Sequence, residues 1–108
     1  MSRFAARKDV NHNEIEAVFR QLLADHVTNT AAWGFGAGDL FVSFGGFCCW
    51  IEIKRDAKAE LTAHQIAFQR VHPHAVLRCE TTAQAIEQCA AIRKLGGLVL
   101  ELAKAPAA

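Results

Sequence analysis

The stretch Gly38-Asp39-Leu40-Phe41-Val42-Ser43-Phe44-Gly45-Gly46-Phe47-Cys48-Cys49-Trp50-Ile51-Glu52-Ile53-Lys54 decides the fold. Two apolar, β-prone runs flank the Gly-Gly pair, a pattern typical of a β-hairpin. With these glycines in the turn, Phe44 lies opposite Phe47. The same register places Asp39 directly opposite Glu52, and a four-residue loop spanning Phe44 to Phe47 gives the same pairing. The turn therefore predicts that two carboxylates meet across the hairpin.

This carboxylate pair needs a positive partner. Opposed side chains on one face of a sheet have Cβ atoms about 4.5–5.5 Å apart, so like charges there repel each other. Lys54 projects from the same face as Glu52 because it lies two residues further along the strand. One lysine cannot neutralise two adjacent carboxylates, so an ion pair with Lys54 alone is the weaker interpretation. The face suits a divalent metal ion held by oxygen ligands beside a scissile phosphate.

Length and composition limit the class of protein. A chain of 108 residues with 52% apolar and 21% charged residues predicts one globular domain with a modest core. The net charge of +1 gives no global signal for nucleic acid, so DNA binding would need a local basic patch. The four cysteines form no spaced framework, which indicates a reduced, cytoplasmic protein. No signal peptide is recognised and no apolar run approaches the roughly 20 residues that cross a bilayer, so no membrane association is expected.

The chain begins with a basic segment and a helical pattern. Residues 1–10 are interpreted as a basic arm that contacts phosphate or as a solvated tail, residues 11–103 as the single domain, and residues 104–108 as a tail. A helix is predicted over residues 12–26, whose apolar residues fall on one stripe. Asn11 or Asn13 would cap it, and each begins a capping box that ends at Glu14 or Glu16. Helix capping alone is enough to explain why Glu14 and Glu16 occur at these positions. The five histidines lack the spacing of a zinc site, so no role is assigned to His12.

Segments on either side of the hairpin complete the fold. Residues 27–35 are predicted to form a strand, which leads into a glycine cluster. A strand follows that cluster, so the phosphate-binding loop of a dinucleotide fold is rejected and no organic cofactor is expected. After the hairpin, Thr62 and Gln65 form a capping box that opens a second helix, and Pro73 follows its end.

The C-terminal part of the chain is predicted as a strand and a helix. The strand covers residues 75–79, and the helix is capped by Thr81 or Thr82 and ends at Gly96-Gly97. Residues 98–102 are either a strand at the sheet edge or a dimer contact. The hairpin strands are apolar on both faces, which requires helices on both sides. The expected fold class is α/β, in the order α-β-β-β-α-β-α, with a mixed central sheet flanked by helices.

The pattern as a whole resembles a known nuclease superfamily. Gly38-Asp39, followed after a short turn by Glu52-x-Lys54, is similar to the PD-(D/E)XK signature. Asn13-Glu14 upstream, the G-A-G-D-L-F-V and W-I-E-I-K segments and L-T-x-x-Q ending at Gln65 extend the likeness over roughly residues 8–92. The chain resembles the small phage and prophage nucleases of the VRR-NUC and Holliday-junction-resolvase-like group. It departs from the family at Gly38, where the family usually has proline.

The resemblance implies a restriction-endonuclease-like core and a Mg²⁺-dependent endonuclease that hydrolyses DNA, with Mn²⁺ as a substitute ion. It implies that Asp39, Glu52 and the backbone carbonyl of Ile53 hold the metal, while Glu14, with Glu16 in reserve, holds a second metal or its water shell. Lys54 would orient the attacking water or stabilise negative charge, and Gln65 would lie near Lys54 and the phosphate. Contacts to the DNA backbone are expected from basic residues in the arm and in the loop after the hairpin: Arg7, Lys8, Arg55 and Lys58.

The resemblance also implies a partner and a setting. Branched or four-way DNA is the expected substrate, in the cytoplasm of a bacterium or of a phage-infected host cell. A homodimer that cleaves two strands and a monomer that nicks or cuts flaps are both compatible with the sequence. The alternative is a catalytically inactive DNA-binding or protein-interaction module on the same fold. The intact set of Asp39, Glu52 and Lys54 argues against that alternative, because an inactive site has no reason to keep two repelling carboxylates.

Overall fold

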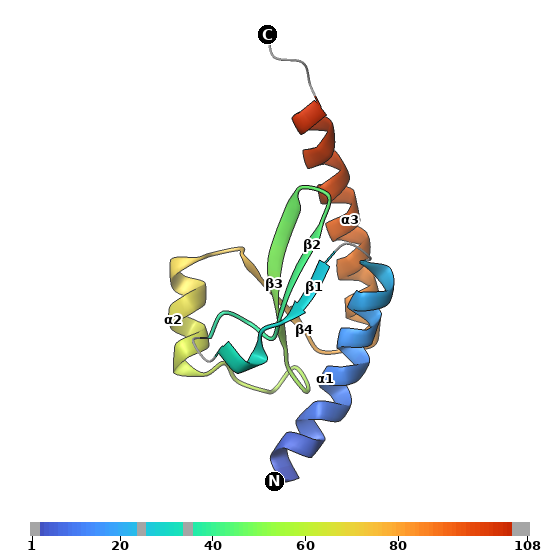
Figure 1. The fold of residues 1–108 in the computed structure, drawn as a ribbon. Coiled ribbons are helices and arrows are strands. Elements are labelled where there is room, and N and C mark those ends of the chain that lie inside the picture. Colours follow the sequence, from blue (N-terminus) through green and yellow to red (C-terminus); the bar gives the residue numbers. More distant parts are fainter. Residues whose placement is uncertain (1–2, 24–25, 34–35, 105–108) are drawn as a thin grey trace.

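A computed structural model describes residues 3–23, 26–33 and 36–104, with residues 3–10 described by their backbone alone. Three α-helices, a short 3-10 helix and four strands make up the fold (Figure 1). In chain order they are α1 (Arg3–Leu22), β1 (His26–Asn29), η1 (Ala31–Trp33), β2 (Leu40–Phe44), β3 (Phe47–Ile53), α2 (Ala63–Val71), β4 (Val76–Cys79) and α3 (Thr82–Lys104). None of the helices within these described ranges is long and apolar enough to span a bilayer.

The four strands form one mixed sheet in the order β1-β2-β3-β4. β1, β2 and β3 pair antiparallel, whereas β4 pairs parallel to β3. A parallel neighbour requires a crossover connection, and α2 with its flanking loops supplies it. The predicted α/β class, with a mixed sheet flanked by helices, is confirmed.

The hairpin has the predicted register. Phe44 pairs with Phe47 and Leu40 pairs with Ile51, and the pairing of the two strands ends there. Asp39 lies one residue before this ladder, and its backbone N–H donates to the Ile51 carbonyl at 2.8 Å, one residue out of the register that would pair it with Glu52. Gly45 has φ +62°, the left-handed conformation that a tight turn uses and that glycine adopts without strain.

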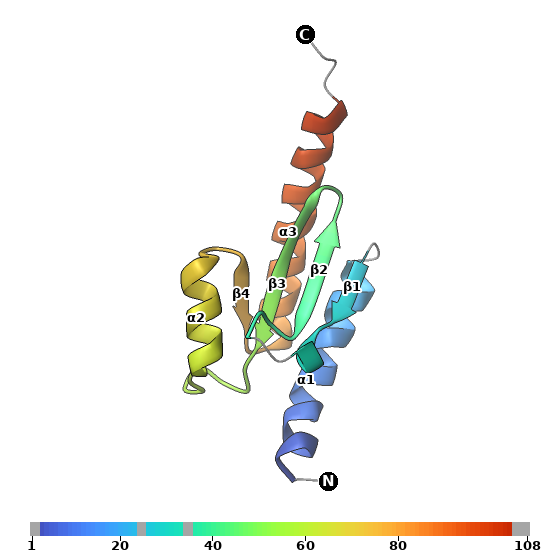
Figure 2. The same ribbon diagram turned by 60° about the vertical axis from the view of Figure 1, so that its left-hand side comes forward.

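The hydrophobic core lies on one face of the sheet. Side chains of β2 and β3 pack there against the buried stripes of α1 and α3: Ile15, Phe19, Leu23, Leu40, Val42, Cys49, Ile51, Ile53, Cys79, Ala85, Cys89 and Ile92. The other face carries Phe41 and Trp50, and Phe68 of α2 contacts the Trp50 ring edge-on. Figures 1 and 2 show α2 on the opposite side of the sheet from α1 and α3. Both faces are thus covered by helices, as the two-sided apolar pattern predicts.

Helix α1 begins earlier than predicted. It runs from Arg3 to Leu22, so residues 3–10, which were expected to precede the helix as a separate arm or tail, belong to the helix itself. Asn11 and Asn13 lie inside the helix, so neither is its N-cap. The segment contains no glycine or proline to break the helix, and the alanines at 5 and 6 favour helix. At the other end, the helix stops four residues before the predicted position 26.

Helix α3 also differs from the prediction, because it continues through Gly96-Gly97 to Lys104. The strand alternative for residues 98–102 is therefore wrong. A Cβ at Gly96 would overlap the carbonyl oxygen of Phe44, and a Cβ at Gly46 would overlap the side chain of Val99. Glycine in a helix interior costs about 1 kcal/mol relative to alanine. Here it lets the hairpin turn pack directly on the helix backbone.

The strand predicted over residues 27–35 is shorter than expected. β1 ends at Asn29, and the chain turns through Thr30 into η1. The Thr30 carbonyl accepts from the N–H of Trp33 at 3.0 Å, and Asn29 Oδ1 accepts from the N–H of Ala31 at 3.1 Å. These local bonds redirect the backbone out of the sheet. Positions 34 and 35 of this predicted strand lie outside the described residues, as do positions 24 and 25 of the predicted first helix and residues 105–108 of the predicted tail.

Candidate active site

Asp39 is fixed at the start of β2 by backbone contacts on both sides. Gly38 before it has φ +151°, and Thr30 Oγ1 donates to the Gly38 carbonyl at 2.9 Å. The carbonyl of Asp39 itself accepts from the N–H of Thr30 at 2.8 Å. Its carboxylate Oδ2 accepts from the N–H of Ile53 at 2.8 Å, and the residue is only 6% exposed. Asp39 is therefore a buried carboxylate held in one orientation across the hairpin.

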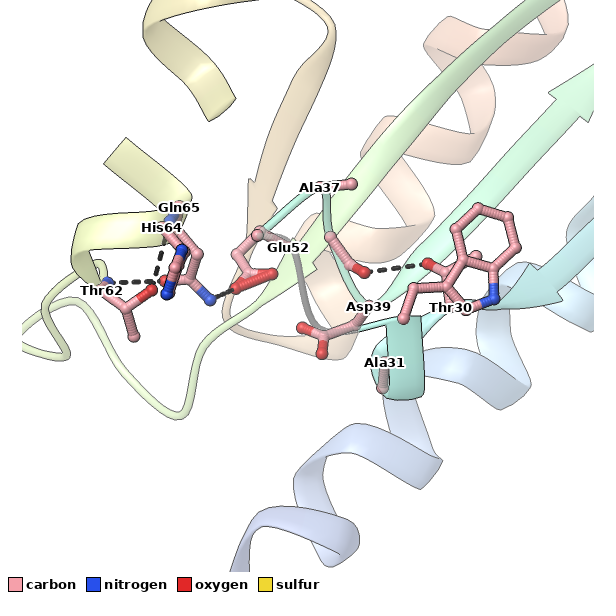
Figure 3. Close-up of a pocket in the computed structure, with 11 residues that line it drawn as sticks. Thr30, Ala31, Ala37, Asp39, Glu52, Thr62, His64 and Gln65 are labelled. Atoms are coloured by element: carbon pink, nitrogen blue, oxygen red, sulfur yellow. Dashed lines mark hydrogen bonds between the residues drawn. The ribbon is translucent and has the colours of Figure 1, made fainter. Parts of the chain in front are cut away.

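Glu52, Lys54 and Gln65 form a polar cluster beside Asp39. Glu52 is 3% exposed, and its Oε1 accepts a hydrogen bond from Nε2 of Gln65. Lys54 Nζ lies 3.7 Å from the same Glu52 oxygen and donates to Gln65 Oε1 at 2.8 Å. Figure 3 shows the Gln65 amide pointing at the Glu52 carboxylate. The Gln65 amide thus bridges a buried carboxylate and an ammonium group.

Gln65 has this position because it also caps α2. Thr62 Oγ1 accepts from the N–H of Gln65 at 3.2 Å, and Gln65 Oε1 accepts from the N–H of Thr62 at 2.8 Å, which confirms the predicted capping box. Gly36 lies directly against this helix start, since a Cβ on it would come within 2.5 Å of the His64 backbone. The glycine loop therefore packs the chain before Asp39 onto the first turn of α2.

These groups line a pocket of about 210 Å³. Its walls come from η1, the glycine loop, the hairpin and the start of α2: Thr30, Ala31, Trp33, Gly36, Ala37, Gly38, Asp39, Glu52, Thr62, His64 and Gln65 (Figure 3). The predicted residues Asp39, Glu52 and Gln65 are among them, and Lys54 reaches the pocket through its bond to Gln65. The structure thus brings together the hairpin carboxylates and the capping glutamine from segments that are separate in sequence.

The helix-borne acid nearest to this pocket is Glu16. At about 100° per residue, Glu16 lies some 40° around the helix from His12, whereas Glu14 lies on the opposite side. Glu14 is exposed and forms no hydrogen bond or ion pair with another described residue. Glu16 Oε1 lies 3.5 Å from His12 Nε2 and accepts from Asn29 Nδ2 at 2.8 Å.

His12 joins Glu16 to the hairpin and was not singled out from the sequence. It is 6% exposed, and its Nδ1 lies 4.0 Å from Asp39 Oδ1. Burial raises the pKa of Glu16, but hydrogen bonds from Arg20 and Asn29, with the charges of Arg20 and His12, outweigh burial and leave the pKa below its usual range. The signal that could have found His12 is its helical phase, three residues before Ile15 and seven before Phe19, which are both buried.

The donor set matches a hard divalent cation in chemistry. Carboxylate and carbonyl oxygens are the ligands that Mg²⁺ prefers, and Asp39, Glu52 and the adjacent Ile53 carbonyl supply them. Among the described side chains, no three of the His, Cys, Asp and Glu groups converge closely enough to hold a metal ion. A metal at this site would therefore rest on two carboxylates and complete its shell with backbone carbonyl, water or substrate oxygens. Mg²⁺ commonly binds proteins in that way.

Comparison of the chain with family models, with curated protein sequences and with solved structures finds no match.

The basic residues expected to contact DNA lie at two places. Arg55 and Lys58 are exposed in the loop that leads from β3 to α2. Arg78 holds this loop, because its guanidinium donates to the carbonyls of Asp56 at 2.9 Å and of Ala59 at 2.6 Å. Arg7 and Lys8 belong to α1, but their side chains lie outside the described residues.

Thiol chemistry is disfavoured at this site. Cys49, Cys79 and Cys89 are buried in the core. Burial raises the pKa of the Cys49 thiol to about 12 and that of the Cys79 and Cys89 thiols to about 11. A thiol with so high a pKa stays protonated near neutral pH and is a poor nucleophile.

Proposed function

We propose that this chain is a metal-dependent endonuclease that hydrolyses DNA phosphodiester bonds, with a preference for branched or four-way DNA. The observation that carries the proposal is the pocket in which buried Asp39 and Glu52 lie beside Lys54 and Gln65. The mixed sheet with helices on both faces is compatible with the restriction-endonuclease-like core that the sequence resemblance implies.

Burial of two carboxylates calls for a chemical reason. A buried charge is costly unless hydrogen bonds and an opposite charge compensate it. A structural ion pair needs one carboxylate for each lysine, and Glu52 lies beside Lys54. Asp39 adds a second negative charge across the hairpin, which a divalent cation would neutralise.

Each residue of the cluster has a role in the proposed mechanism. Asp39, Glu52 and the Ile53 carbonyl would hold Mg²⁺, or Mn²⁺ in its place, and such an ion would supply polarisation of the phosphate and a lower pKa for a coordinated water. The Lys54 ammonium stabilises negative charge that develops on the phosphate oxygens, or orients the attacking water. Gln65 holds that ammonium through its 2.8 Å hydrogen bond and keeps Lys54 beside Glu52.

We assign the helix-borne acid of the site to Glu16 in preference to Glu14. Glu16 faces the sheet and connects to Asp39 through His12, whereas Glu14 is exposed. The role expected from the resemblance, that of holding a second metal or its water shell, is thereby moved by two residues, from Glu14 to the reserve candidate Glu16. Arg55 and Lys58, with Arg7 and Lys8 of α1, remain the proposed contacts to the DNA backbone.

We also propose that the protein forms a homodimer through the end of α3. The end of this helix extends beyond the hairpin turn (Figure 1). Helix α3 exposes Leu95, Leu98 and Leu102, which repeat at i, i+3 and i+7 on one stripe. Lys94 and Glu101 are exposed beside that stripe. In a two-fold antiparallel pairing of α3 with its copy, Lys94 of one chain would lie beside Glu101 of the other, which adds charge complementarity to leucine burial.

The proposal is tested by DNA cleavage. Branched, duplex and single-stranded DNA are incubated with Mg²⁺ or Mn²⁺ and wild-type protein, Asp39→Ala, Lys54→Ala or the surface control Glu87→Gln. Wild type and Glu87→Gln should cut branched DNA, and the two site variants should not. Equal cleavage by all four proteins would refute the site. DNA binding without cleavage under either metal would favour the inactive module.

A further inference from the structure

Trp33 stands at the rim of the candidate active site. It ends η1, lines the same pocket as Asp39 and Glu52, and leaves 54% of its surface exposed. A tryptophan has a large apolar ring that is favourably buried, so exposure of half of it beside a polar pocket suggests a ligand that covers it.

The indole of Trp33 packs against another aromatic ring of the fold. Its ring meets that of Trp50 edge-on, with centroids 5.7 Å apart and an interplanar angle of 74°. Trp50 is itself packed edge-on by Phe41 at 4.8 Å and by Phe68 at 6.0 Å. The exposed ring therefore rests on an aromatic cluster that reaches from the hairpin to α2.

Trp33 is also tied to the position of Asp39. The Thr30 carbonyl accepts from the N–H of Trp33 at 3.0 Å, while the Thr30 N–H donates to the carbonyl of Asp39 at 2.8 Å. The Thr30 hydroxyl fixes the Gly38 carbonyl as well. One buried residue thus sets the spacing between an exposed aromatic ring and the carboxylate proposed to hold the metal.

We infer that Trp33 is the stacking platform for an unpaired nucleobase next to the scissile phosphate, an inference that rests on the proposed nuclease function. Every base offers a π-face on which an aromatic side chain can stack, but in an intact duplex neighbouring bases cover both faces. A ring fixed at this rim selects a strand with an unstacked base, such as a flap, a branch point or a single strand. With a net charge of only +1, the protein has little general electrostatic attraction to DNA, so stacking has a large share in affinity.

The test is fluorescence of protein that carries Trp50→Phe, in which Trp33 is the single remaining tryptophan of the two. The protein is titrated in EDTA, which removes divalent metal ions and so prevents cleavage. The ligands are oligothymidylate, a duplex of the same length, and a series of oligothymidylates that carry one abasic site at successive positions. Single-stranded DNA should quench the emission, duplex should not, and an abasic site at one position should weaken binding. Trp33→Ala should lower affinity for the single strand by about 5- to 150-fold, the loss of one stacked base, while Trp33→Phe retains most of it.

The outcomes separate this inference from the nuclease proposal. If oligothymidylate quenches Trp33 but no DNA is cleaved with any metal, the base site stands and the nuclease proposal fails. If DNA is cleaved while Trp33→Ala binds single strands as tightly as wild type, the stacking inference fails and the nuclease proposal stands. A change of oligomeric state in Trp33→Ala with unaltered DNA affinity would assign the ring to a protein contact and overturn the inference. Should Trp33→Ala not fold, Trp33→Phe and the abasic series decide the question.

Discussion

Gly38 offers the sharpest test of how the site is held, because the nuclease superfamily that the sequence resembles usually has proline at this position. Its φ of +151° lies in a region that L-residues rarely adopt, and strain of this kind costs about 1–3 kcal/mol. A Cβ would also approach the Ile51 carbonyl oxygen to 3.0 Å. Gly38→Ala should therefore destabilise the protein by about 2–3 kcal/mol, a large part of the roughly 5–15 kcal/mol typical of a domain.

Urea denaturation measures this effect. With a slope of about 2 kcal/mol per molar urea, Gly38→Ala should lower the midpoint by roughly 1 M. Proline is locked near φ of about −65°, so Gly38→Pro should displace the backbone before Asp39 and abolish the proposed cleavage, although proline is usual at this position in the superfamily that the sequence resembles. A displacement of about 1 Å at a reacting group can reduce a rate by about 100-fold.

Gly97→Ala is the matched control, because it is a helical glycine with nothing within 4 Å of an added Cβ. It should stabilise the protein by about 0.5–1 kcal/mol. If Gly38→Ala is as stable as wild type while Gly97→Ala behaves as expected, the positive φ does not constrain the site and the account of Asp39 positioning is wrong.

Three further results are expected. Folding lowers the pKa of Glu16, so its ionised form contributes stability above the unfolded pKa, and that contribution is lost as the pH falls below about 4. Glu16→Gln should therefore make the stability measured by acid denaturation less dependent on pH in that range than it is in wild type. A thiol reagent at neutral pH should label Cys48 alone in the native protein and all four cysteines in denaturant, and fast native labelling of a second thiol would contradict the burial of the other three. Leu98→Glu should shift the mass measured by light scattering from dimer to monomer, and a monomeric wild type would end the proposed α3 pairing.

Features set by local chemistry could be predicted from the sequence. Gly45-Gly46 and the apolar alternation determine the hairpin register, since a slip of one residue would turn every buried side chain to the wrong face. The Thr62–Gln65 capping box depends on four consecutive residues and appears as predicted. Asp39 and Glu52 line the same pocket, although the strand pairing itself stops one residue short of setting them opposite each other.

Features set by tertiary packing could not be predicted in this way. From the sequence alone, Gly96 predicts the end of a helix. The structure explains a glycine inside the helix, because the backbone of Phe44 packs where a Cβ of residue 96 would lie. The phase of α1, which turns Glu16 toward the sheet and Glu14 away, depends on how the helix packs on the strands. The sequence places Trp33 in a predicted strand. In the structure, the backbone hydrogen bonds of Thr30 turn the chain into η1 instead.

The central claim is that Asp39 and Glu52 share one divalent ion, and binding of Mn²⁺ tests it most directly. The decrease in the electron paramagnetic resonance signal of free Mn²⁺ is measured for wild type, Asp39→Asn, Glu52→Gln and the surface control Glu87→Gln. Wild type and the control should bind about one ion per chain in this pocket, and each site variant should bind at least about 10-fold more weakly. Equal Mn²⁺ affinity in all four proteins would contradict the claim.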